Sequence, residues 1–215
     1  MKTLLLDFGG VCLITPFELH DRVERAFGVA SGSLTWRGPF DPAGDILWQA
    51  VTAGEITERD YWAQRAMELG VMIGRPGLDT AVYMEAINEP PSMDLIRPDA
   101  IATVQEARAA GWRVGVLTND LRAFTGPTWA SRMAFFDLID PLLDCSTTNI
   151  LKPDPRAYRW AIESLGGPVA DILFVDDQPI NVQGAVAAGL ETIAFDVTAA
   201  AASWSAIRQR LELTG

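Results

Sequence analysis

Four short segments of the chain carry polar side chains where buried strands end or a helix begins. They are Asp7 after Thr3–Leu6, Thr118-Asn119-Asp120 after residues 114–117, Lys152 before a helix that begins at Pro155, and Asp176-Asp177 after residues 173–175. Together they offer carboxylates from two strands, one hydroxyl group and one ammonium group. These groups could act as one site only if the fold brings them together.

The pair Asp176-Asp177 is the most specific of these signals. Two adjacent carboxylates that directly follow apolar residues repel each other unless a cation lies between them. Hard oxygen ligands, without suitable cysteine or histidine neighbours, favour Mg²⁺ over softer metals. We therefore expect a magnesium site at the end of this strand.

The other segments also have purely structural interpretations. An aspartate after a strand, such as Asp7, is often a turn former or a helix cap. Thr118 could be a capping hydroxyl group and Asp120 the N-cap of a helix. Lys152 alone could be a solvated loop lysine. Only their combination points to a function.

The elements that must position these residues alternate between strands and helices over the second half of the chain. After a break at residues 88–92, the pattern predicts strands at 112–117, 172–175 and 192–195, a short strand around 138–143, and helices at 98–111, 121–136, 155–167, 180–188 and 200–213. Residues from about 15 to 90 show helical spacing only. Such alternation favours a parallel sheet with right-handed crossovers.

The predicted fold class is α/β, with a doubly wound, Rossmann-like parallel sheet and an inserted all-helical cap domain. Residues 1–14 and 92–215 form the core, and residues 15–91 form the cap. In such sheets ligands bind beyond the carboxyl ends of the strands, where the polar segments lie.

The four segments resemble, in order, the four motifs of the haloacid dehalogenase-like hydrolase superfamily, within its subfamily I, which has a helical cap of the C1 type. The motifs are Asp7-Phe8-Gly9-Gly10-Val11, Leu117-Thr118-Asn119, Lys152-Pro153-Asp154-Pro155 and Asp176-Asp177-Gln178-Pro179-Ile180-Asn181-Val182. The resemblance spans the whole chain, and the most similar branch is that of sugar phosphatases and epoxide-hydrolase N-terminal domains.

The resemblance implies a Mg²⁺-dependent phosphatase for a small phosphorylated metabolite, such as a sugar phosphate. Asp7 would attack phosphorus and form an aspartyl-phosphate that water hydrolyses. Lys152 would neutralise developing charge and hold Asp7 ionised. The remaining roles are metal binding by Asp7, the Gly9 carbonyl, Asp177 and Asp176, phosphate binding by Gly9, Gly10, Thr118, Asn119 and Lys152, and orientation of Asp177 by Asn181.

One position departs from the family pattern. Most phosphatases of the superfamily carry a second aspartate, a general acid and base, where this chain has Gly9. Glu18, His20 or a water molecule on the metal could replace it, or the leaving group could need no proton, as in anomeric sugar phosphates and acyl phosphates. Three other functions are alternatives to a phosphatase. The chain could be a weak or inactive relative kept as a binding or regulatory protein, or a 2-haloacid dehalogenase, which needs no Mg²⁺. The least favoured alternative is another phosphoryl-transfer reaction.

Substrate choice should lie in the cap. Arg37, beside Trp36, could bind the substrate, although a buried Trp36 with a solvated Arg37 is an equal alternative. His20, the single histidine, is more readily a surface residue than a site residue. Trp48, Tyr61 and Trp62 lie at helical spacing and should form the cap core.

Composition and charge narrow the partners and the compartment. The chain has 215 residues, 49% of them hydrophobic, and a formal net charge of −11, which disfavours nucleic acid and anionic membrane surfaces. No apolar run reaches the ~20 residues that span a bilayer. The early charge at Asp7 argues against a signal peptide, so we expect the protein to stay in the cytoplasm. The expected oligomeric state is a monomer or a homodimer. Cys12 and Cys145 should be buried and free.

Overall fold

The computed structural model describes residues 1–213 and divides the chain into two compact units. The sheet unit consists of Met1–Ile14 and the chain from Pro91 onward. The helical unit is Thr15–Pro90. The two halves of the sheet unit are therefore joined through the helical unit.

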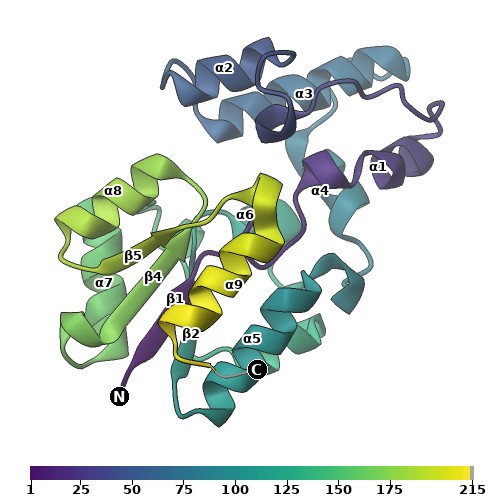
Figure 1. Ribbon diagram of the computed structural model, residues 1–215. Coiled ribbons are helices and arrows are strands. Elements are labelled where there is room, and N and C mark those ends of the chain that lie inside the picture. Colours follow the sequence, from purple (N-terminus) through teal and green to yellow (C-terminus); the bar gives the residue numbers. More distant parts are fainter. Residues whose placement is uncertain (214–215) are drawn as a thin grey trace. The chain divides into compact units, whose positions relative to one another are not determined.

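A five-stranded sheet with the order β3-β2-β1-β4-β5 forms the centre of the sheet unit (Figure 1). The strands are β1 (Thr3–Leu6), β2 (Arg113–Thr118), β3 (Leu142–Asp144), β4 (Ile172–Asp176) and β5 (Glu191–Ala194). All four neighbouring pairs are parallel. In β1 and β4 every residue is buried, as expected for parallel strands that are covered on both faces.

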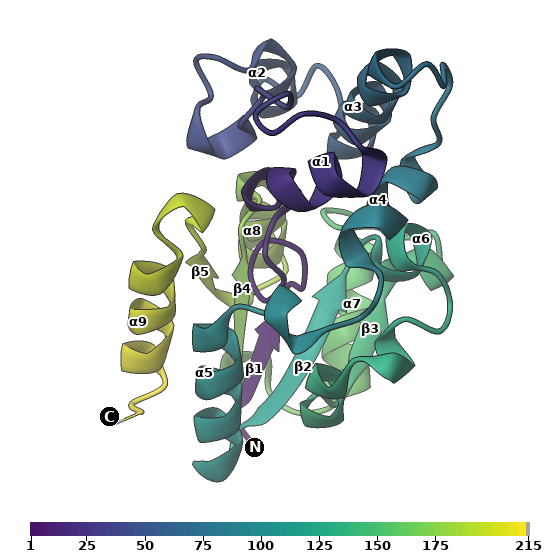
Figure 2. The same ribbon diagram turned by 90° about the vertical axis from the view of Figure 1, so that its right-hand side faces the viewer.

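Helices cover both faces of this sheet, which confirms the doubly wound α/β fold (Figures 1 and 2). They are α5 (Pro98–Ala109), α6 (Leu121–Thr125), α7 (Pro155–Leu165), α8 (Pro179–Ala187) and α9 (Ala200–Arg210). α7 and α8 lie on one face, and α5 and α9 lie on the other. On the first face Tyr158 and Ala161 of α7 pack with Phe174 of β4 in a fully buried core.

The predicted helix over residues 121–136 is the clearest error in the expected elements. Only α6 is helical, and it is followed by single 3₁₀ turns at Ala130–Arg132 and Ala134–Leu138. Gly126 ends α6 with a φ of +83°, and Pro127 has no N–H group with which to continue the helical hydrogen bonds. The chain then enters β3, the short strand expected around residues 138–143.

The helical unit contains α1 (His20–Phe27), α2 (Ile46–Thr52), α3 (Glu58–Met72) and α4 (Thr80–Asn88). Its core is aromatic. The Phe17 ring lies 4.8 Å from Trp62, 5.2 Å from Trp48 and 5.7 Å from Tyr61, measured between ring centroids. All four side chains are buried, which confirms the predicted core role of the last three.

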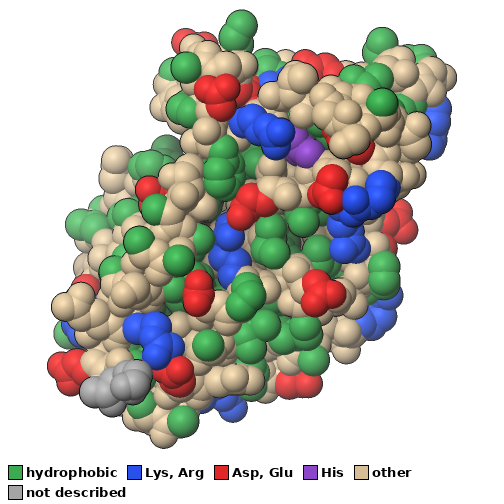
Figure 3. Space-filling model, turned by 45° about the vertical axis from the view of Figure 1, so that its right-hand side comes forward, with side chains coloured by type: hydrophobic (Ala, Val, Ile, Leu, Met, Phe, Trp, Pro, Cys, Tyr) green, Lys and Arg blue, Asp and Glu red, His purple; other side chains and the backbone are tan. Residues whose placement is uncertain are grey.

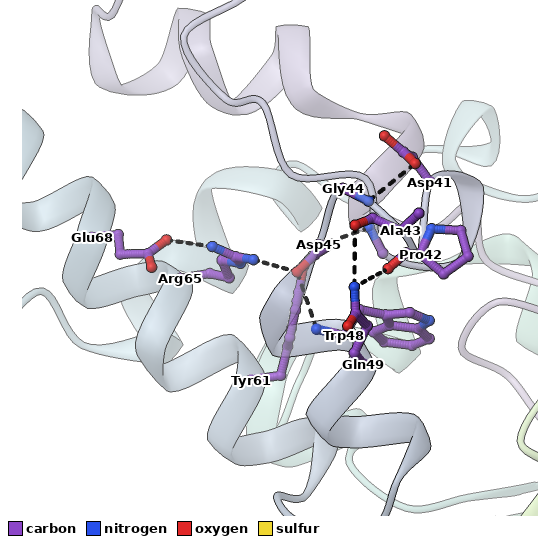
Figure 4. A network of polar contacts seen from close by, with 11 residues as sticks. Asp41, Pro42, Ala43, Gly44, Asp45, Trp48, Gln49, Tyr61, Arg65 and Glu68 are labelled. Atoms are coloured by element: carbon purple, nitrogen blue, oxygen red, sulfur yellow. Dashed lines mark hydrogen bonds and ion pairs between the residues drawn. The ribbon is translucent and has the colours of Figure 1, made fainter.

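A buried carboxylate connects the segments of the helical unit (Figure 4). Asp45, which is 1% exposed, accepts hydrogen bonds from Trp48 N at 3.0 Å and Tyr61 Oη at 2.7 Å, and forms an ion pair with Arg65. Arg65 also contacts Glu68 at 2.6 Å. Because these partners come from α2 and α3, Asp45 fixes how the two helices meet.

Two further expectations concern the cysteines and the membrane. Cys12 and Cys145 are both buried and free, as predicted. Within residues 1–213, no helix combines the length and apolar character that crossing a bilayer requires.

Candidate active site

Three charged side chains meet at the carboxyl ends of β1 and β4. Lys152 Nζ lies 2.9 Å from Asp7 Oδ1 and 2.6 Å from Asp176 Oδ2. The Lys152 side chain is 1% exposed, that of Asp176 is fully buried, and that of Asp7 is 12% exposed. The fold thus brings the lysine of one predicted segment between carboxylates of two others, and Asp7 keeps a small opening to solvent.

The charges of these groups depend on one another. Burial raises the pKa of Asp7 to about 7, because the nearby Lys152 ammonium only partly offsets the loss of water and Asp176 adds repulsion. Burial disfavours the charge on Lys152, but Asp176 and Asp7 outweigh it and raise the pKa of the ammonium group. Lys152 therefore stays protonated, and ionised Asp7 would be favoured by a second cation.

The donor set fits a magnesium ion. Carboxylate oxygens of Asp7, Asp176 and Asp177 all lie within 4.8 Å of one another, and hard oxygens are the ligands that Mg²⁺ prefers. Gly10 leaves room for this cluster, since a Cβ atom there would lie 2.5 Å from Asp177 Oδ2. Its φ of +72° is also a conformation that favours glycine.

The Asp176 carboxylate accepts hydrogen bonds from three protein groups. Its Oδ1 accepts hydrogen bonds from Gln178 N at 2.9 Å and Asn181 Nδ2 at 3.0 Å, while Oδ2 accepts from Lys152. Asn181 was expected to orient Asp177, and the hydrogen bonds of its side chain go to Asp176. The reason is that Asp176 ends β4 fully buried, with its carboxylate beside the first turn of α8, where Asn181 lies.

Thr118 and Asn119 lie at the carboxyl end of β2, at the same edge of the sheet. Thr118 is the last residue of β2 and is 5% exposed. The Asn119 side chain binds the main chain of Lys152 twice: Nδ2 donates to the Lys152 carbonyl at 3.0 Å, and Oδ1 accepts from the Lys152 N–H at 2.8 Å. This contact joins the second and third predicted segments directly.

The two glycines after Asp7 have different surroundings. The Gly9 carbonyl accepts a hydrogen bond from Val11 N at 2.8 Å, and one lone pair remains for another partner. A Cβ atom at Gly9 would meet no heavy atom within 4 Å, whereas Gly10 is closely surrounded. Gly9, where the family pattern expects a second aspartate, therefore has space for a side chain.

Two residues that support the site escaped the sequence analysis. Arg97, 7% exposed, donates from Nε to the Gly10 carbonyl at 2.8 Å and so holds the loop after Asp7. Asp144 ends β3 and accepts from Arg122 N at 2.8 Å, at the start of α6. Asp144 could have been found as a further carboxylate after a strand, but no sequence pattern singles out Arg97.

Two predicted residues belong to the helical unit. Trp36 is buried and Arg37 is exposed, so Arg37 is available to solvent on this unit. His20 is 5% exposed, which contradicts its expected place on the surface, because its ring packs 4.2 Å from the Trp36 ring. Burial and the nearby Arg37 lower the pKa of His20 to about 4.

Comparison with known proteins points to one family. A family model described as haloacid dehalogenase-like hydrolase matches residues 1–189. A phosphoglycolate phosphatase of Cereibacter sphaeroides is 30% identical over 204 residues, which cover 91% of this chain and 85% of that protein. A phosphatase of Mycobacterium tuberculosis is 38% identical over 99 residues, 46% of each chain, so this match spans less than half of the relative.

Relatives with other names also match. An (S)-2-haloacid dehalogenase of a Pseudomonas species is 27% identical over 118 residues, 54% of this chain and 51% of that one. Among solved structures, a putative hydrolase of the same family from Bacillus subtilis, bound to magnesium, has a TM-score of 0.68 at 16% identity and covers 90% of this chain and 86% of its own. At that identity the likeness concerns the fold alone.

Proposed function

Since the chain belongs to the haloacid dehalogenase-like hydrolases, we propose that it is a Mg²⁺-dependent phosphatase that acts through an aspartyl-phosphate on Asp7. The observation that carries the proposal is the contact of Lys152 with both Asp7 and Asp176, in a group of three carboxylates that could hold one ion. The substrate is a small phosphorylated metabolite, such as a sugar phosphate. The phosphatase relatives support this class of reaction.

The reaction has two steps on Asp7. A carboxylate oxygen of Asp7 attacks phosphorus, and the bond between phosphorus and the leaving oxygen breaks. Water then attacks the phosphorus of the aspartyl-phosphate, which releases inorganic phosphate and restores the carboxylate. Lys152 and the Thr118 hydroxyl group donate to phosphate oxygens and stabilise the charge that develops there. The main chain at Gly9, Gly10 and Asn119 lets the phosphate approach closely.

Asp7, Asp177 and the Gly9 carbonyl are the residues that would hold the metal. Bound there, Mg²⁺ would screen the repulsion between the Asp7 carboxylate and the phosphate. Asp176 lies within reach of the same ion, but its hydrogen bonds show that it also fixes Lys152. We propose that Asn181 acts through Asp176, which it contacts.

The open position at Gly9 narrows the substrate class. Of the alternative proton donors, Glu18 Oε2 already accepts hydrogen bonds from Thr15 N at 3.0 Å and Thr15 Oγ1 at 2.7 Å. His20, with a pKa of about 4, is a neutral imidazole at neutral pH and therefore lacks the acidic imidazolium proton that a general acid donates. We propose that the substrates have leaving groups that depart without a proton, as anomeric sugar phosphates and acyl phosphates do.

The helical unit is proposed to act as the cap that selects the substrate, with Arg37 as the residue that contacts it. An Arg37→Ala variant should then raise KM for the preferred substrate and leave kcat on p-nitrophenyl phosphate unchanged. An Arg37→Ala enzyme with unaltered KM on every substrate would remove Arg37 from the proposal.

The test is a panel of anomeric and non-anomeric phosphate esters and acetyl phosphate, assayed with Mg²⁺ and with EDTA. Phosphate release that EDTA abolishes and Mg²⁺ restores supports the proposal, and Asp7→Asn should be inactive. Trapping the phosphoryl group on Asp7, detected by mass spectrometry of the peptide, would identify the intermediate. Activity that survives Asp7→Asn would overturn it.

A dehalogenase is the second candidate, because dehalogenases are among the relatives and Gly9 removes the phosphatase aspartate. The same protein is therefore assayed on 2-chloropropionate. Chloride release without metal and without phosphatase activity would favour this candidate. The cluster of Asp176 and Asp177 beside Asp7 argues against it, since carbon–halogen hydrolysis needs no metal ion.

A further inference from the structure

We propose that Asn119 is a positioning residue whose side chain holds the main chain of Lys152, so that Lys152 Nζ stays between Asp7 and Asp176. The kinetic consequence rests on the proposed phosphatase function, while the structural consequence does not. This role is separate from phosphate binding by the Asn119 backbone N–H, because the contacts with Lys152 use only the Asn119 side chain.

The contact uses both polar atoms of the Asn119 amide. Nδ2 donates to the Lys152 carbonyl at 3.0 Å, and Oδ1 accepts from the Lys152 N–H at 2.8 Å, across a sequence separation of 33 residues. A single planar amide that binds the N–H and the C=O of one residue fixes the direction of that residue's main chain. It cannot at the same time offer the same bonds to a substrate.

The position of the Lys152 main chain matters because it determines whether Nζ reaches both Asp7 and Asp176. Nζ lies 2.9 Å from Asp7 Oδ1 and 2.6 Å from Asp176 Oδ2, in a site where the lysine side chain is 1% exposed. A shift of about 1 Å in a reacting group can cost about 10²-fold in rate. Asn119 follows Thr118 directly, so the end of β2 both supplies a hydroxyl group and fixes the lysine.

The chain offers an unusually direct test, because it contains only two lysines, Lys2 and Lys152. Protein labelled with ¹³C and ¹⁵N in lysine alone gives two sets of side-chain signals. In Asn119→Ala we expect the Lys152 Cε and Nζ signals to move toward the values of a solvated lysine, while the Lys2 signals stay in place. Gln105→Ala, which removes an exposed amide from α5, is the matched control and should leave both lysines unchanged.

The kinetic arm measures whether the contact serves the reaction. On the best phosphate ester of the panel, Asn119→Ala should lower kcat by about 10- to 100-fold and change KM by less than about threefold. In a Lys152→Met background the same substitution should have no further effect on residual activity, because there is no ammonium group left to position. Fully additive losses would overturn the proposal.

Two controls keep the result decisive. Thermal melting shows whether Asn119→Ala folds, and Asn119→Ser serves in its place if it does not. If the wild-type protein has no phosphatase activity, the phosphatase proposal fails, and the lysine spectra still decide the role of Asn119. Unchanged Lys152 signals in a folded Asn119 variant would overturn the positioning role whatever the activity.

Discussion

Gly9 and Gly10 are adjacent, yet the structure predicts opposite responses to a side chain. A Cβ atom at Gly9 meets no heavy atom within 4 Å, so Gly9→Asp should fold with an unchanged melting temperature. If the missing acid limits the rate, Gly9→Asp should speed hydrolysis of alkyl phosphates, which have poor leaving groups, by roughly tenfold or more, toward the ~10²–10⁴ of general acid–base catalysis. Steady-state kinetics on alkyl and acyl phosphates would measure this.

Gly9→Asn is the matched control for that substitution, since it has the same shape and cannot donate a proton as an acid. Equal gains in both variants would rule out acid catalysis as the cause. Gly10→Ala provides the steric contrast: its Cβ would lie 2.5 Å from Asp177 Oδ2, at a φ of +72°. We expect it to lose activity and about 1–2 kcal/mol of unfolding free energy.

Lys152 is the one cation that the described contacts place between Asp7 and Asp176. Lys152→Met removes the charge and keeps most of the volume, which leaves two buried carboxylates facing each other. Breaking a buried pair in this way costs about 3–5 kcal/mol, and we also expect phosphatase activity to fall to a small residual level. Urea unfolding in EDTA would measure the change.

A second substitution separates the two effects of Lys152. Lys152→Met with Asp176→Asn should recover part of the stability, because one uncompensated charge is gone, but none of the activity. A double variant as unstable as Lys152→Met would mean that Asp176 is not the source of the destabilisation.

At the scale of elements, the sequence predicted the sheet better than its connections. The apolar runs that became β1, β2 and β4 are fully or almost fully buried, so their composition alone indicates their place. Residues 126–138 form turns that depend on Gly126 and on packing, and their helical spacing was misleading. Apolar periodicity reports burial, and it does not report which backbone hydrogen bonds form.

The sequence likewise located some residues of the candidate site but did not predict the contacts between them. Asp7, Thr118 and Asp176 could be located because the end of a strand is visible in sequence. The partner of Asn181, the contact of Asn119 with Lys152 and the bond from Arg97 to Gly10 could not, since each joins segments whose orientation depends on the folded main chain. Which carboxylate faces a helix is set by the register of the strand, and a one-residue change reverses it.

In the helical unit, Asp45 should be more important for stability than its place in a loop suggests. Asp45→Ala removes the buried acceptor of Trp48 N, the Tyr61 hydroxyl group and Arg65. Of the two carboxylates that the described contacts pair with the guanidinium group, only the half-exposed Glu68 remains. We expect a loss of about 3–5 kcal/mol, measured by calorimetry. Asp41→Ala, an exposed neighbour, is the control, and an equal effect of both would contradict the prediction.

The single histidine gives the helical unit a pH dependence. Burial and Arg37, with a smaller contribution from Arg65, lower the pKa of His20 to about 4, although Glu24 acts in the opposite direction. Because the unfolded chain binds a proton near pH 6.5 and the folded chain does not, the unfolding free energy should fall as the pH drops from about 6.5 to about 4. Above pH 7 this contribution should be constant.

NMR of the His20 ring tests this directly, because no other histidine contributes a signal. The ring signals should titrate with a midpoint near 4. His20→Gln should lose the corresponding part of the pH dependence of unfolding. A midpoint near 6.5 would show that the ring is solvated.

For the whole molecule, the formal net charge of −11 opposes the approach of an anionic substrate. On the face drawn in Figure 3, acidic and basic side chains of the described residues are interspersed, so that face does not gather positive charge into a broad area. Raising the ionic strength from about 0.01 M to about 0.15 M shortens the Debye length from about 30 Å to about 8 Å. The KM for a phosphate dianion should therefore fall.

The salt experiment needs a control in which a different salt gives the same ionic strength. Mg²⁺ is held constant, and sodium and potassium chloride are compared so that effects of a particular ion are recognised. A KM that rises with salt would mean that local groups such as Lys152 dominate the attraction of the substrate.

The strand order also has a consequence for how the chain becomes active during synthesis. Asp7 directly follows β1, which leaves the ribosome before the other strands, and both neighbours of β1 in the sheet, β2 and β4, come more than a hundred residues later. Such long-range pairing is slow, because a large loop must close before the pairing contributes stability. Asp7, the proposed nucleophile, therefore has neither Lys152 nor Asp176 beside it until translation has passed residue 176.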